Sequence, residues 1–212
     1  LKDLVGVTKA VANAQIIVAR PDLGVKNLQE YLALAKQKDG GLTVGTASNG
    51  GIGHLAHELL AQATDTKYTF IPYKGGAPAV TDLLGGHVDA IIITLAAVTE
   101  HVRAGRLTAI AVTSPERVAA LPDVPTIAES AVPGFNVVSW QGFHVSAKTP
   151  RAIVEKLNKD FVAALTAPDV KSFLEDQGYG VVATSAEEID KTVAADYERY
   201  KKVIETAGIP VD

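Results

Sequence analysis

The sequence predicts an α/β fold with a mostly parallel sheet that helices cover on both faces. Apolar segments of strand length alternate with segments whose apolar residues recur at helical spacing. Strand segments such as Gln15–Ala19 and Ala90–Ile93 are almost continuously apolar, as expected when both faces of a sheet are covered. The chain has 212 residues, 47% of them hydrophobic and 21% charged, which is enough for one large domain or two small lobes.

Composition argues against several classes of protein. The net charge is −4 without a basic run, which argues against a nucleic-acid surface, and no apolar run reaches the ~20 residues of a membrane span. Cysteine is absent, which excludes disulfides and makes structural zinc unexpected. Methionine is also absent, so Leu1 is not a translational start, and we expect a processed or partial chain whose beginning says nothing about secretion.

Strands and helices alternate regularly over the first 112 residues. Expected strands cover 15–19, 43–46, 68–73, 88–93 and 107–112, and expected helices begin near residues 27, 53, 78 and 96. Gly40-Gly41 ends the first of these helices, and Pro78 suits the first turn of the third. Residues 114–133 form a proline-punctuated loop.

The last third of the chain changes character. Residues 136–145 resemble a long strand and contain the single tryptophan, Trp140, which we interpret as packing or, less simply, as lining a ligand cleft. Three helices follow: Thr149-Pro150 supplies an N-cap and a first-turn proline, Pro168 begins the second, and Ser185–Glu188 is a capping-box pattern. Their apolar stripes need further protein to cover them.

The stretch Thr43–Leu60 joins a strand, a glycine-rich turn and a helix start. Free N–H groups and the helix dipole favour an anion at such a place, and glycines let a ligand approach the backbone. The alternative, which the stretch itself leaves open, is that Gly50, Gly51 and Gly53 only shape a tight turn.

Two further places could contact the same ligand. Lys74-Gly75-Gly76 also follows a strand and precedes a helix; it is not a Walker loop, and the alternative is a surface lysine beside a turn. Thr94 ends a strand, where ligand contacts of open parallel sheets gather. Asp89 needs partners if buried, and we interpret it as a strand-start residue bonded to backbone.

No arrangement of residues indicates catalysis or a metal. His54, His57 and Glu58 match neither order of the zinc-protease motif, and we expect His57 and Glu58 to face solvent. His87 and His144 are isolated. No G-x-S-x-G motif or triad spacing exists, so we predict no enzyme, no catalytic residue, no metal and no cofactor.

Several motifs are similar to those of the Bug family, the extracytoplasmic solute receptors of tripartite tricarboxylate transporters. The most specific is FIPYKGGAPAVTDLLGGHVD at Phe70–Asp89, together with TASNGGIGHLAHELL at Thr46–Leu60. The likeness covers essentially the whole chain and continues through Ala109–Ser114, Leu121–Thr126, Pro133–Phe135, Ser139–Gly142 and Ala207–Ile209.

The resemblance implies a type II periplasmic-binding-protein fold with two lobes. Residues 1–20 would cross from lobe one, 21–138 would form the ligand-binding lobe two, and 139–212 would return and pack helices on lobe one. The first lobe is then incomplete here, because the family's opening strand and its P-G-G-G-type loop are absent. Gly50, Gly51 and Ile52 replace serines common in the family, and Thr94-Leu95 replaces a frequent Asp-Asn pair, so no particular ligand carries over.

The resemblance and the residues agree on the function. A small di- or tricarboxylate or related organic acid would be held, without bond cleavage, by Thr46, Ser48, Asn49, Gly50, Gly51, Tyr73, Lys74, Gly75 and Thr94. The receptor would be a periplasmic monomer that delivers its ligand to membrane transporter subunits. Two alternatives are the effector-sensing domain of a LysR-type regulator and a hydrolase or transferase using Ser48 or His54, which lacks an evident base.

Overall fold

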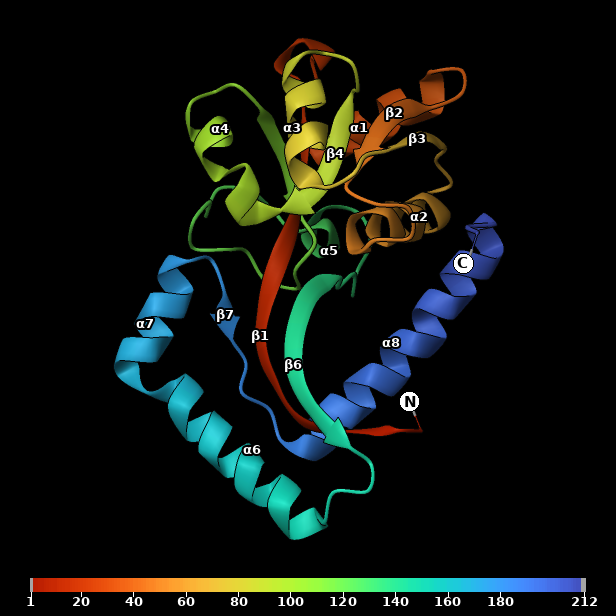
Figure 1. The fold of residues 1–212 in the computed structure, drawn as a ribbon. Coiled ribbons are helices and arrows are strands. Elements are labelled where there is room, and N and C mark those ends of the chain that lie inside the picture. The colour runs from red at the N-terminus through yellow and green to blue at the C-terminus, as the bar shows by residue number, and fades with distance from the viewer. Residues whose placement is uncertain (1, 211–212) are drawn as a thin grey trace. The chain divides into compact units, whose positions relative to one another are not determined.

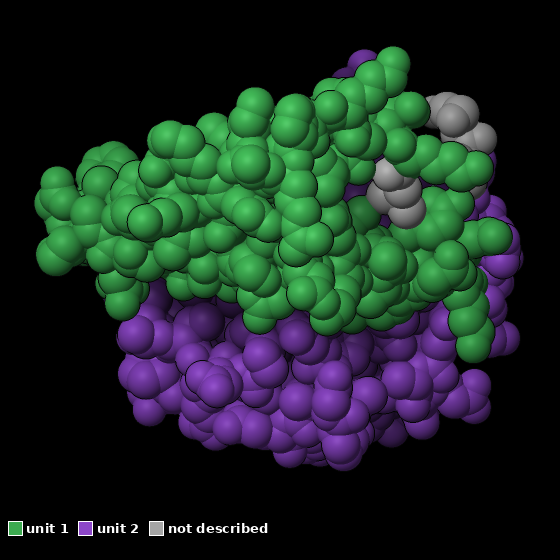
Figure 2. All heavy atoms as spheres, turned by 90° about the horizontal axis from the view of Figure 1, so that it is seen from below, with its two compact units in different colours: residues 1–13, 139–202 green, residues 14–138, 203–212 purple. Residues whose placement is uncertain are grey.

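Strand β1 (Leu4–Ala19) contributes residues to both of the units into which the chain divides. The computed structural model describes residues 2–210 (Figure 1). Unit 1 comprises Leu1–Asn13 and Ser139–Lys202, and unit 2 comprises Ala14–Val138 and Val203–Asp212 (Figure 2). The segment predicted from the sequence, Gln15–Ala19, covers only the end of this strand. The first part of the strand was missed because its apolar and polar residues alternate less clearly.

Unit 2 is built on a sheet with the order β3-β2-β4-β1-β5. The other four strands are β2 (Leu42–Thr46), β3 (Tyr68–Pro72), β4 (Ala90–Thr94) and β5 (Thr108–Val112). β2 pairs in parallel with β3 and β4, whereas β1 is antiparallel to both β4 and β5. The predicted α/β fold is therefore confirmed, but the sheet is mixed rather than mostly parallel, because β1 pairs antiparallel with both of its neighbours, β4 and β5.

Two apolar clusters cover the two faces of this sheet. Ile17 and Ile92 pack in one cluster with residues of α1 and α2, while Ile16 and Ile91 pack in the other with residues of α3. Successive strand residues point to opposite faces, so a continuously apolar strand serves both clusters. The helices are α1 (Leu28–Gln37), α2 (Ile52–Thr64), α3 (Gly76–Leu84), α4 (Thr99–Arg103) and α5 (Ile127–Ser130), with short 3-10 turns η1 (Pro21–Leu23) and η2 (Leu95–Ala97).

Local capping explains where several of these helices begin. The Asn27 side chain accepts a hydrogen bond from the Glu30 N–H at 2.9 Å and caps α1. Helix α5 lies within the segment predicted as a loop, and a capping box between Thr126 and Glu129 fixes its start. The prolines around this short helix hid its pattern in the sequence. The helix expected near residue 96 is divided into η2 and α4.

Unit 1 combines the first part of β1 with β6 (Val138–Ser146), β7 (Gly180–Val181), α6 (Arg151–Thr166), α7 (Pro168–Asp176) and most of α8 (Ala186–Ala207). Ser185 and Glu188 exchange capping hydrogen bonds at 2.9 and 3.2 Å, which confirms the predicted capping box. The predicted N-cap Thr149 is wrong: Pro150 occupies the cap of α6 without a side-chain hydrogen bond, because the helix begins one residue later than expected.

Two glycines let α8 approach the strands of unit 1. A Cβ atom on Gly6 would lie 2.3 Å from Ile189 Cγ2, and one on Gly142 would lie 2.6 Å from Ile189 Cδ1. The Gly6 N–H also donates to Asp190 Oδ1 at 2.8 Å. Ile189 is consequently fully buried although it stands near the start of its helix.

Much of the remaining apolar surface of unit 1 is exposed. Among the described residues, seven of the eight exposed large hydrophobic side chains belong to this unit: Leu4, Phe143, Ile153, Val170, Phe173, Val182 and Tyr197. Unit 2 contributes only Leu84 to that set. Within residues 2–210, no helix combines the length and the apolar character that crossing a membrane requires.

Candidate functional site

A cavity of about 260 Å³ lies within unit 2, where β2 and β4 end and α2 and α3 begin. Its lining contains polar atoms but no Lys, Arg, Asp or Glu side chain. The lining residues are Gln15, Ala47, Ser48, Gly51, Ile52, Gly53, His54, Gly76, Ile92, Ile93, Thr94 and Ala97. The carboxyl ends of parallel strands are where ligands of open α/β sheets bind.

The first turn of α2 presents unpaired backbone donors to this cavity. Among the described residues, none accepts a hydrogen bond from the N–H of Ile52, Gly53 or His54. Gly53 also brings the helix close to the sheet, because a Cβ there would lie 2.4 Å from the Ile92 carbonyl oxygen. Unpaired amides and the positive end of the helix dipole together favour an anionic group.

Hydrogen bonds brace the loop between β2 and α2 from two sides. The Gly50 N–H donates to His54 Nδ1 at 3.0 Å, so this imidazole nitrogen is unprotonated. The Tyr73 and Gly75 N–H groups donate to the carbonyl oxygens of Thr46 and Ala47, both at 2.8 Å. The two glycine-containing loops predicted from the sequence are thus tied directly to one another, and the first is held in place before any ligand binds.

Gln15 is a polar lining residue that the sequence did not single out. It lies opposite Thr94 in the antiparallel register of β1 and β4, and its Nε2 donates to Thr94 Oγ1 at 3.3 Å. The side chain belongs to a residue only 2% exposed. The only signal in the sequence was a carboxamide side chain at the start of an apolar strand. That signal does not show which residue the side chain contacts.

The structure brings together three of the nine predicted ligand-binding residues. Ser48, Gly51 and Thr94 line the cavity. Gly50 braces the loop through His54, and Gly75 does so through Ala47. Ligand binding by any of the nine stays a prediction.

The other four predicted residues lie outside the cavity lining. Thr46 is buried with its hydroxyl unpaired, whereas Asn49 and Lys74 are exposed. The Tyr73 hydroxyl donates to Asp82 Oδ2 at 2.8 Å; burial and this carboxylate raise the pKa of Tyr73 to about 12.

The expected solvent exposure of His57 is wrong. His57 is fully buried, with its Nε2 3.1 Å from the Tyr31 hydroxyl and its ring among Tyr68 and Phe70. Burial, and secondarily the neighbouring His54, lower the pKa of His57 to about 3. Its helical position faces the sheet because Ala56 and Leu60 turn the same side of α2 inward. Over residues 2–210, no three His, Asp or Glu side chains are grouped as a metal site would require.

Asp89 lies outside the cavity and holds the opposite ends of the strands together. Its carboxylate accepts hydrogen bonds from the backbone N–H and hydroxyl of Thr43, both at 2.9 Å, and forms ion pairs with Lys38 and Arg20. Burial alone would raise its pKa, but the hydrogen bonds from Lys38, Thr43 and Arg20 outweigh burial and lower the pKa to about 2. This residue is a structural anion, bonded to backbone as predicted and to two cations besides.

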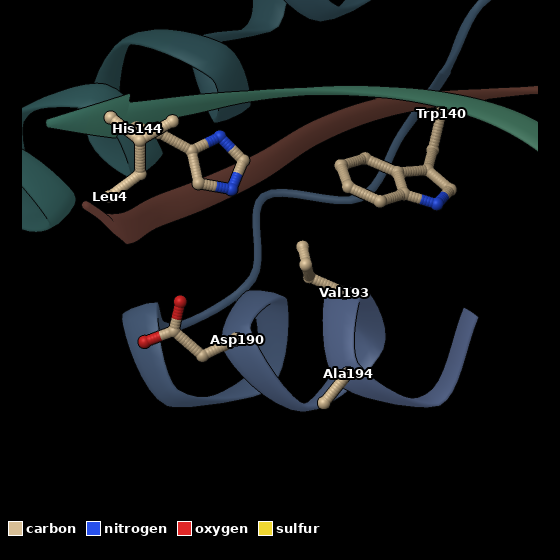
Figure 3. A pocket seen from close by; sticks show the side chains of 6 residues that line it. All are labelled: Leu4, Trp140, His144, Asp190, Val193 and Ala194. Carbon is tan, nitrogen blue, oxygen red and sulfur yellow. The ribbon is translucent and has the colours of Figure 1, made fainter. Parts of the chain in front are cut away.

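A second cavity, of about 470 Å³, lies within unit 1 (Figure 3). Trp140 and His144 reach it from β6, Leu4 from β1, and Asp190, Val193 and Ala194 from α8. The Trp140 indole N–H donates to Asp196 Oδ2 at 2.8 Å, and Leu4 is 58% exposed. Trp140 therefore lines a partly open apolar hollow rather than filling a closed core.

The fold and the first cavity define a class: an α/β unit with a pocket, lined by no Lys, Arg, Asp or Glu, at the carboxyl ends of parallel strands. The family described as tripartite tricarboxylate transporter family receptor matches residues 1–209, and the chain belongs to it. The predicted family resemblance is therefore confirmed.

Individual relatives agree with this membership. The UPF0065 protein of the tcbD–tcbE intergenic region of a Pseudomonas species is 35% identical over 96% of this chain and 61% of its own length. A solved structure of R. palustris Rpa4515 with adipate has a TM-score of 0.84 at 32% identity, over 98% of this chain and 70% of that one. MatC from Rhodopseudomonas palustris with bound malate has a TM-score of 0.76 at 27% identity, over 95% and 69%.

The chain is shorter than these relatives. It spans 61%, 56% and 64% of the length of three curated relatives that it matches. Properties that depend on the whole length of such a protein are therefore proposals for this chain.

Proposed function

We propose that this chain is the ligand-binding part of an extracytoplasmic solute receptor that captures a small carboxylate and delivers it to a tripartite tricarboxylate-type membrane transporter. The observation that carries the proposal is the cavity of unit 2, whose lining lacks Lys, Arg, Asp and Glu and includes the first-turn residues of α2, with their unpaired amides, together with Ser48 and Thr94. Family membership and the adipate and malate seen in two related structures support the same ligand chemistry.

The strength of such binding follows from a few charge-assisted hydrogen bonds. Each contributes about 1.5–3 kcal/mol when one partner is ionised. Four bonds at the upper end of that range, less an association cost of at least about 4 kcal/mol, leave about −8 kcal/mol. That free energy corresponds to micromolar affinity.

The site supports binding without turnover. His54 Nδ1 already accepts the Gly50 N–H, so it is not free to take a proton from Ser48. No hydrogen bond joins Ser48 to a histidine among residues 2–210. The family match also gives no support to the LysR-type alternative.

We further propose the lobe arrangement implied by the family. Residues 21–138 form lobe two, residues 1–20 and the strand after 139 form the crossovers, and the helices of the tail belong to lobe one. The exposed apolar side chains and the open hollow beside Trp140 support the idea that further protein completes lobe one. Periplasmic location, a monomeric state and docking to transporter subunits are parts of the same proposal.

Isothermal titration calorimetry of the 212-residue chain against a panel of small organic acids tests the function. We expect at least one acid, adipate and malate included, to bind, and Ser48→Ala to weaken its binding at least fivefold. Ser172→Ala, which changes an exposed serine of α7, is the matched control and should leave the affinity unchanged.

Two results would overturn the proposal. One is that no acid of the panel binds. The other is a reaction product, detected by NMR, where unchanged ligand is expected.

A further inference from the structure

Gln15 brings a hydrogen-bond acceptor, its carboxamide oxygen, to the cavity, and within residues 2–210 no group donates to that oxygen. Its Nε2 is engaged with Thr94 Oγ1, whereas no described residue donates to its Oε1. Gln15 is only 2% exposed, yet it is one of the lining residues, so the carboxamide meets the space of the cavity rather than bulk solvent. An acceptor at a cavity wall that takes no hydrogen bond from the protein is available to a ligand or a water molecule there.

The backbone of Gln15 is fixed firmly, so its side chain is presented in a defined place. The Gln15 N–H donates to Thr113 Oγ1 at 3.1 Å, and the Thr113 N–H donates to the Gln15 carbonyl oxygen at 2.9 Å. Thr113 Oγ1 in turn bonds to the Val137 carbonyl oxygen. Such clamping preorganises the carboxamide before a ligand arrives.

Thr94 completes a paired donor and acceptor. Because Thr94 Oγ1 accepts from Gln15 Nε2, its own O–H proton is free to be donated into the cavity. Together, Gln15 Oε1 and the Thr94 hydroxyl suit a ligand group that both donates and accepts a hydrogen bond. A ligand hydroxyl does so, whereas an ionised carboxylate only accepts and a methylene does neither.

Because the cavity lining has no acidic side chain, it favours a ligand with a hydroxyl group over a ligand with an ammonium group. None of the twelve lining residues is an Asp or a Glu, so a ligand ammonium would be desolvated without a countercharge. A neutral hydroxyl needs none.

We propose that Gln15 is a specificity-determining residue and that the ligand is a hydroxy-carboxylic acid: its carboxylate meets the amides of α2 and its hydroxyl meets Gln15 and Thr94. This inference rests on the proposed function and narrows it to one class of carboxylate.

Calorimetry with matched pairs of acids tests it, using malate against succinate and citrate against tricarballylate. Each pair differs by one hydroxyl. We expect the hydroxy acid of at least one pair to bind at least tenfold more tightly, because the analogue leaves Gln15 Oε1 unpaired. Aspartate should bind more weakly than malate, because the lining lacks an acidic residue.

Variants at the same position assign the preference to this side chain. Gln15→Leu has similar size and no acceptor, and it should reduce the hydroxy-acid preference to within threefold; the exposed Gln177→Leu should keep it. Gln15→Glu supplies a carboxylate and should shift the preference from malate towards aspartate. Thermal melts check that each variant is folded. The affinity ratios for the acid pairs are measured on the wild-type chain and so do not depend on the folding of any variant.

The results of these titrations distinguish failure of the hydroxy-acid inference from failure of the proposed receptor function. Binding of both members of every pair with affinities within threefold overturns the hydroxy-acid inference and leaves a carboxylate receptor. A tenfold preference that survives in Gln15→Leu overturns the role of Gln15. Failure of all the acids to bind overturns the proposed function, and this inference with it.

Discussion

The backbone N–H of Gly50 donates a hydrogen bond to Nδ1 of His54, four residues further along, at 3.0 Å. The imidazole is 5% exposed and lies against Phe70, with ring centroids 4.4 Å apart. A buried side chain of α2 therefore fixes the loop that precedes the same helix, and with it the direction of the unpaired amides.

This bond predicts different behaviour for two variants of His54. His54→Leu leaves the Gly50 N–H unpaired, at a cost of about 1–3 kcal/mol, and should weaken ligand binding at least fivefold. His54→Asn places an oxygen near the position of Nδ1 and should retain most of the affinity. Calorimetry measures both; equal affinities for the two variants would show that the bond has no part in binding.

Lys74 should act on the ligand through charge rather than through contact. It is exposed and lies outside the cavity lining, so we expect Lys74→Ala to weaken binding of an acid two- to fivefold without changing the melting temperature. The difference should disappear in about 0.5 M salt, where charges are screened. Lys159→Ala, at an exposed position of α6, is the control. A salt-independent loss would indicate direct contact instead.

His57 predicts a dependence of stability on pH. The unfolded histidine takes up a proton near pH 6.5, whereas the buried one does so only near its pKa of about 3. Between these values the unfolded state binds more protons, so the free energy of unfolding falls as pH falls, by about 1.4 kcal/mol per pH unit from this group. Above pH 6.5 the contribution is fully present.

Urea unfolding between pH 4 and 7 measures this dependence. His57→Gln, which has no proton to take up in this range, should show a shallower slope than the wild-type chain. Identical slopes would mean that His57 is reached by solvent and protonated in the folded state.

Because Asp89 forms ion pairs with Lys38 and Arg20, we expect a substitution that removes only its charge to lower the free energy of unfolding strongly. Asp89→Asn removes the anion between Lys38 and Arg20 and should lower the free energy of unfolding by about 3–5 kcal/mol. Asp123→Asn, at an exposed loop position, should change it by less than about 0.5 kcal/mol. Chemical denaturation of the two variants gives the comparison, and similar values would contradict a structural role for Asp89.

The Asp89 carboxylate also predicts how the stability of the chain changes in acid. Its pKa of about 2 lies below the ordinary value of 3.8, so its stabilisation is present above pH 3.8 and is lost as pH falls towards 2. We therefore expect the wild-type and Asp89→Asn chains to approach one another in stability below pH 2, as circular dichroism during acid titration would show.

Two adjacent residues of α6 test which side of this helix is packed. Val154 is 6% exposed and Ile153 is 50% exposed. Val154→Ala should lower the free energy of unfolding by about 2 kcal/mol, whereas Ile153→Ala should change it by less than about 0.5 kcal/mol. If Ile153→Ala were equally harmful, the exposed side of α6 would have to be buried in solution.

Local chemistry accounts for what the sequence predicted well. Strand order along the chain, the glycine-rich start of α2, the Ser185–Glu188 capping box and the first-turn Pro168 all depend on residues a few positions apart. Helical periodicity wrongly predicted that His57 faces solvent. Two neighbouring faces of α2 are apolar enough to be buried, and the packing against Tyr31 decides which of them is buried.

The sequence by itself determined the class of fold and the family, and it predicted, as a proposal still to be tested, the loop for an anion. Only the tertiary structure decided that β1 enters the sheet antiparallel between β4 and β5, and that Gln15 thereby stands opposite Thr94, 79 positions away. The physical reason is that periodicity and turn residues report the local conformation of the chain. The partner of a side chain across a sheet depends instead on how distant strands pair, and no local pattern encodes that pairing.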